Sequence, residues 1–131
     1  MKQLARIAAF IIVMMSFCMA TAQTKPIDFT QQLTNAANVP IIEPGTDGKS
    51  QPMQLWEVAV NALEANTTAD AALPGLKKFE LDQLARKIYK NKSCVLTADE
   101  LKTIKERIGQ DYGPMIVGAA WSLLGGSELP K

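Results

Sequence analysis

Apolar residues recur at helical spacing from residue 53 onwards. In a first predicted helix, four of them share one face: Met53, Trp56, Val60 and Leu63. A second helix is predicted over about 77–91, with an apolar inward face made of Leu81, Leu84, Ala85 and Ile88. On its outer face, Asp82, Arg86 and Lys90 follow at four-residue steps, which places opposite charges within reach of one another. These patterns predict amphipathic helices packed around one core.

The third helix has the clearest start signal in the chain. Thr97 and Glu100 form a capping box, in which each side chain accepts a hydrogen bond from the other residue's backbone amide. Leu101, Ile104 and Ile108 are the predicted buried stripe of this helix, and Gly109 is its predicted end.

A fourth helix is predicted over 115–124, between Pro114 and the pair Gly125-Gly126. Ser122 is its one clearly polar residue, so protein or lipid must cover most sides. One interpretation makes it the central helix of a four-helix domain. The other makes it a face that meets a partner or a second subunit, with these candidate contacts: Met115, Val117, Gly118, Trp121, Ser122 and Leu124.

The segment 23–52 shows no sustained period and contains four prolines. Pro44-Gly45 and Asp47-Gly48 are turn dipeptides placed almost back to back. We therefore expect a flexible arm here, with a short helix over 29–37 as one option. Ile27, Phe29 and Leu33 are residues that would pin parts of it to a surface.

Residues 1–22 have the composition of a secretory signal peptide. Lys2 and Arg6 precede an apolar run that ends at Ala20-Thr21-Ala22, a small-x-small cleavage pattern. Cleavage near Ala22-Gln23 predicts a periplasmic or secreted protein. The apolar run is short of the roughly 20 residues that a spanning helix needs, so a signal retained as a membrane anchor is the second choice. No stable membrane span is expected in the mature chain.

Taken together, the patterns predict an all-α protein with a compact bundle of about four short helices. The expected divisions are a cleaved signal peptide (1–22), the flexible arm (23–52), the helical domain (53–125) and a C-terminal tail (126–131).

Export changes the charge and the cysteine content. Without Lys2 and Arg6 the 14 basic residues fall to 12, against 13 acidic ones, so the mature chain is near neutral. That balance disfavours nucleic acid as a partner. Cys18 leaves with the signal, so Cys94 is the only thiol expected in the mature chain. We expect Cys94 to be a half-buried structural cysteine. A reactive cysteine is the alternative, because Lys90 and Lys92 are close in sequence.

The chain has no histidine, which removes the commonest general base and the commonest transition-metal ligand. The sequence predicts no catalytic residue, no cofactor and no metal site. Glu57 and Glu64 lie two turns apart on one face. We interpret them as solvent-exposed side chains and not as the catalytic carboxylate pair of a hydrolase.

The second helix carries a weak basic patch, which is better explained as a soluble helix face than as an anionic-ligand site. Its members are Lys77, Lys78, Arg86, Lys87, Lys90 and Lys92.

Five runs between about residues 55 and 124 resemble small helical proteins encoded in tailed-phage genomes. The runs are Lys78-Phe79-Glu80-Leu81, 84–89, 96–100, Ile104-Lys105 with Ile108-Gly109, and 113–118. They are packing and capping motifs, so the resemblance implies a helical fold and a phage or prophage setting. Those proteins are typically short and lack an export signal.

The function expected from the sequence is an exported, non-enzymatic helical module that binds a protein in the bacterial envelope or associates with itself. Regulation of lysis and exclusion of a second phage are analogies from the phage resemblance. One alternative is a virion structural or assembly protein translated from Met53, and another is a small envelope hydrolase.

Overall fold

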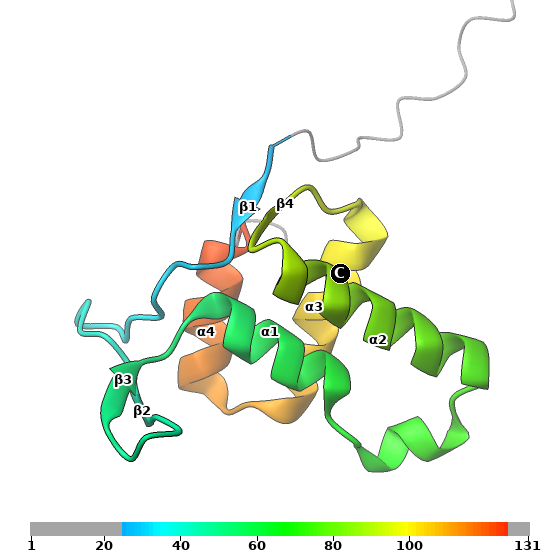
Figure 1. The fold of residues 1–131 in the computed structure, drawn as a ribbon, viewed down its shortest axis with the longest axis horizontal. Helices are drawn as coiled ribbons and strands as arrows, with labels where there is room; N and C mark the ends of the chain where they lie inside the picture. Colours follow the sequence, from blue (N-terminus) through cyan, green and yellow to red (C-terminus); the bar gives the residue numbers. More distant parts are fainter. Residues whose placement is uncertain (1–24, 126–131) are drawn as a thin grey trace, which may run out of the picture.

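A computed structural model describes residues 25–125, and within that range the chain forms four α-helices, a short 3-10 helix and two small antiparallel strand pairs (Figure 1). The mostly helical class is as predicted, whereas the strands are not. The predicted signal peptide 1–22 and the predicted C-terminal tail 126–131 lie outside the described residues.

Helix α1 (Leu55–Glu64) is the centre of the fold, because α2 (Gly75–Lys90), α3 (Ala98–Asp111) and α4 (Pro114–Leu123) all pack on it (Figure 1). Six of its ten residues are buried, so the buried surface of α1 is wider than the single apolar face predicted from the sequence. The central helix is therefore α1 and not α4.

Residues 25–52 do not form a loose arm or a helix over 29–37. Phe29 and Leu33 are completely buried in the same core as the helices, and Ile27 and Ile41 are nearly so. Backbone hydrogen bonds hold the segment there, from the Phe29 amide to the Lys92 carbonyl at 2.7 Å and from the Leu33 amide to the Met53 carbonyl at 2.9 Å. The predicted boundary at residue 52 consequently crosses one continuous core.

The strands are short, and one pairing is distant in sequence while the other is a local hairpin. β1 (Ile27–Asp28) lies antiparallel to β4 (Ser93–Cys94), with Ile27 opposite Cys94. β2 (Ile42–Pro44) and β3 (Ser50–Pro52) form a hairpin beside the start of α1 (Figure 1). Gly48 has a φ of 77° in the turn of this hairpin, a conformation that glycine adopts without strain.

Helix ends follow from capping residues. The predicted box of Thr97 and Glu100 is confirmed at the start of α3, and Pro114 opens α4 as predicted. A box that the sequence analysis did not identify starts α1, where the Gln54 amide donates to the Glu57 carboxylate at 2.9 Å. Gly109 does not end α3, which continues to Asp111; its bare Cα instead faces the Trp121 ring.

η1 (Thr68–Ala72) joins α1 to α2 and was not expected from the sequence. Thr67 and Asp70 cap it in the same reciprocal way as Thr97 and Glu100 cap α3. No helix among residues 25–125 has the length and apolar character needed to cross a membrane.

Candidate functional site

The α4 surface is the first candidate site. Pro114 fixes the helical backbone at its start, and after Leu124 the chain turns away at Gly125, whose φ is 91°. Of the ten residues in α4, only Ala120 is buried. The helix carries no charged residue, and Met115 is the large hydrophobic side chain on its uncovered side.

The six predicted contact residues divide between two faces of α4. Met115 is 56% exposed, and Gly118 and Ser122 follow it at the spacing of one outer face. The Ser122 hydroxyl donates to the Gly118 carbonyl at 2.8 Å, so its polar group is satisfied within the helix. Val117 is half-buried on the opposite side of the helix, where it packs against the core, so its assignment to the same contact face is wrong.

The other two predicted contacts also face the core. Leu124 is 1% exposed and packs with the buried residues, so its assignment to a partner interface is wrong. Trp121 is half-buried against α3, where its indole N–H donates to the Lys105 carbonyl at 3.1 Å. Trp121 therefore holds α4 to α3. The outer face of α4, defined as Met115, Gly118, Ala119 and Ser122, is the part left for a partner.

Most of the predicted basic patch on α2 is engaged in ion pairs or aromatic contacts. Lys77 pairs with Glu80, Arg86 pairs with Asp82 as predicted, and Lys87 reaches Glu100 of α3 at 2.9 Å. The ammonium of Lys92 lies 4.5 Å from the ring centre of Trp56 and 4.8 Å from that of Tyr89. Four of the six basic side chains are therefore engaged by neighbouring groups.

Cys94 is a free, buried thiol in β4. Burial raises its pKa, and the nearby charge of Lys87 opposes that rise. A raised pKa keeps the thiol protonated, which agrees with the structural role predicted for it.

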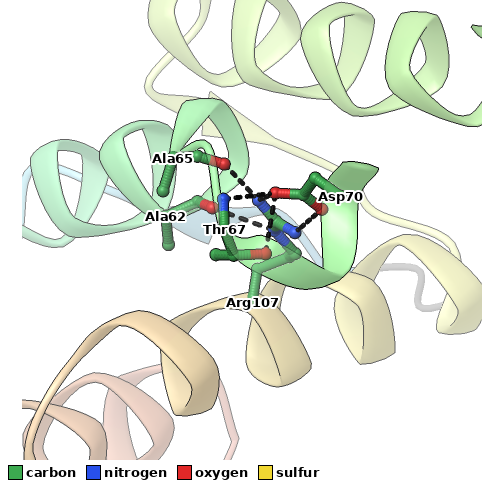
Figure 2. Close-up of polar contacts among 5 residues, drawn as sticks. All are labelled: Ala62, Ala65, Thr67, Asp70 and Arg107. Atoms are coloured by element: carbon green, nitrogen blue, oxygen red, sulfur yellow. Dashed lines mark hydrogen bonds and ion pairs between the residues drawn. The ribbon is translucent and has the colours of Figure 1, made fainter. Parts of the chain in front are cut away.

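A buried ion pair joins α3 to the end of α1 and to η1 (Figure 2). The Arg107 guanidinium donates to both carboxylate oxygens of Asp70, to the Ala62 carbonyl at 3.0 Å and to the Ala65 carbonyl at 2.7 Å. The Arg107 hydrogen bond and the Thr67 amide hold the pKa of Asp70 well below its usual range. Sequence reasoning missed this cluster, although the T-x-x-D spacing of Thr67 and Asp70 is a capping signal.

Two carboxylates lie close together beside the hairpin. Burial is the main cause that raises the pKa of Glu43, and the neighbouring carboxylate of Glu57 raises it further. The sequence predicts that Glu57 and Glu64 are both solvent-facing side chains without a specific role. Glu57 differs from that prediction, because its carboxylate caps the start of α1.

A groove of about 690 Å³ lies between α2 and α3, with η1 at one end. This α2–α3 groove has the size of many ligand sites and was not predicted. Its lining residues are Ala69, Asp70, Leu73, Lys77, Phe79, Glu80, Leu81, Gln83, Leu84, Lys87, Asp99, Glu100, Thr103, Glu106, Arg107 and Gln110. Glu57 is not among them, and neither is Glu64.

Comparison of the chain with protein-family models, with curated proteins and with solved structures gives no match.

Proposed function

We propose that this protein is a non-catalytic binding module, exported to the bacterial envelope, that contacts a protein partner through the outer face of α4. The exposed, uncharged surface of α4 is the observation that carries the proposal. Apolar patches of this kind mark contact sites in soluble proteins. A prophage-encoded regulator of lysis or of superinfection would use such a module, by analogy with the phage proteins that the helices resemble.

The export part of the proposal depends on the signal-like residues 1–22, and the core argues against the alternative of a start at Met53. A protein translated from Met53 would lack Ile27, Phe29, Leu33 and Ile41, all of them buried. Losing four core side chains, at about 1.5–3 kcal/mol each, exceeds the margin of a small domain. Intact-mass measurement of the natural product tests this: a start near Gln23 supports export, and a start at Met53 contradicts it.

Gly118 offers a clean test of the α4 face. A Cβ atom built on Gly118 has no neighbouring atom within 4 Å, so larger side chains fit there in the free protein. Gly118→Ala should stabilise α4 by about 0.5–1 kcal/mol and leave the face nearly flat. Gly118→Arg should fold equally well while placing a long charged side chain across the face.

Affinity capture from envelope extract, with both variants as bait, measures the effect. We expect a partner that wild type and Gly118→Ala retain and that Gly118→Arg loses. Thermal unfolding confirms that both variants are folded. If Gly118→Arg captures the same partner as wild type, the outer face of α4 is not the contact surface.

A further inference from the structure

The α2–α3 groove exists because the two helices pack on α1 but contact each other little. Its lining runs along α2 from Lys77 to Lys87 and along α3 from Asp99 to Gln110, about 15 Å of each helix. The Lys87–Glu100 pair spans it near one end, and the Asp70–Arg107 pair lies near the other. A helix of about three turns matches this length.

The lining combines apolar and charged groups in a way that favours an amphipathic ligand. Leu73 and Leu81 are half-buried and Leu84 is buried, so they offer an apolar floor. On the first turns of α2, Phe79 is 59% exposed at the rim. Grooves with these properties take the apolar face of a helix from another protein.

Charge decides which kind of helix fits. The lining contains five carboxylates and three basic groups. Each basic group is paired with a carboxylate of the same groove: Lys77 with Glu80, Lys87 with Glu100 and Arg107 with Asp70. Asp99 and Glu106 supply the remaining negative charge, and within residues 25–125 the one ion pair of Glu106 is with the exposed Lys102, at 3.8 Å.

From the apolar floor and the excess of carboxylates, we propose that the α2–α3 groove binds a cationic amphipathic helix of a partner protein. The apolar face of that helix covers Leu81 and Leu84 and contacts Phe79, while its lysines or arginines approach Asp99 and Glu106. This site is separate from the outer face of α4 and does not depend on the function proposed for that face.

Two synthetic helical peptides of about 14 residues test the proposal. They share one leucine face, and they differ only in that one carries lysine and the other glutamate on its flanks. Fluorescence anisotropy with the protein as recovered from an expressing bacterium should show at least about tenfold tighter binding of the lysine peptide. Raising the salt concentration should narrow that preference.

Variants in the groove locate the binding. Neutralising both carboxylates, in Asp99→Asn with Glu106→Gln, should bring the two peptides close to equal affinity. Neutralising two carboxylates elsewhere, in Asp47→Asn with Asp111→Asn, is the matched control and should retain the preference. Phe79→Ser should weaken the lysine peptide about tenfold. Val39→Ser, at a residue 53% exposed outside the groove, should not weaken it.

Three results would overturn the proposal. The first is equal binding of both peptides to wild type, and the second is a lysine preference that survives Asp99→Asn with Glu106→Gln. The third is a concentration-dependent dimer that Phe79→Ser abolishes, which would assign the groove to a second copy of this chain. Gly118→Arg should leave peptide binding unchanged, so failure of the α4 proposal and failure of this one are distinguishable.

Discussion

Arg107 and Lys105 are buried cations two residues apart on α3, and they are satisfied in different ways. Arg107 holds the α1–η1 junction with a carboxylate and two backbone carbonyls (Figure 2). Lys105 faces the α4 junction, where its ammonium donates to the Gly125 carbonyl at 3.1 Å, its one acceptor among residues 25–125. A cation near the end of α4 also interacts favourably with the helix dipole.

The difference shows what each junction requires. Removing Arg107 would strand a buried carboxylate and two carbonyls that its guanidinium satisfies. Among residues 25–125, removing the Lys105 ammonium would leave one carbonyl, that of Gly125, without this hydrogen bond. Burial alone therefore does not measure how much a charged residue stabilises this fold; the partners that it would leave behind do.

The largest expected effect is that of Arg107→Met. This change leaves Asp70 without its counter-ion and with only the hydrogen bonds from Thr67, and it should lower the free energy of unfolding by about 3 kcal/mol. Urea unfolding followed by circular dichroism measures the loss. A loss of less than about 1 kcal/mol would mean that the junction does not depend on the ion pair.

Acid should weaken the same junction. The pKa of Asp70 lies below its ordinary value of 3.8 in the fold, so the stability it contributes is present above that value. It is lost as the pH falls toward the lowered pKa. Glu43 has a raised pKa and acts in the opposite sense, favouring the fold at low pH and losing that contribution as the pH rises through its own pKa.

Comparing wild type with Asp70→Asn isolates the Asp70 contribution, because Glu43 is present in both proteins. The difference in melting temperature should be largest near neutral pH and should shrink below about pH 4. A difference that stays constant from pH 7 to pH 2 would contradict the assignment.

The smallest expected effect is that of Lys105→Met, the matched replacement on the same helix. Methionine keeps most of the apolar stem and removes one hydrogen bond, so the free energy of unfolding should fall by about 1 kcal/mol or less. The same urea titration applies. Equal losses for Lys105→Met and Arg107→Met would remove the distinction between the two junctions.

Signals carried by neighbouring residues predicted local features well. Thr97 with Glu100, Pro114, and Asp82 with Arg86 each act within one or two helical turns, and all three features are present. Three other helices are too few to surround an apolar helix, and α4 is indeed covered on one side.

Features that depend on distant residues were out of reach. Phe29 and Leu33 show no period because hydrogen bonds to Lys92 and Met53, and not a regular helix or strand, set their burial. Arg107 meets a carboxylate 37 positions away, and no local pattern connects the two. The α2–α3 groove likewise follows from how two helices sit on a third.

The pairing of β1 with β4 has a consequence for the order in which the protein folds. Ile27 finds its partner Cys94 only after most of the chain has been made, so this contact is non-local and slow to form. Before Cys94 and the residues after it are synthesised, the core around Phe29 lacks some of its contacts. The core around Phe29 is therefore complete only once the chain on both sides of α1 and α2 has been synthesised.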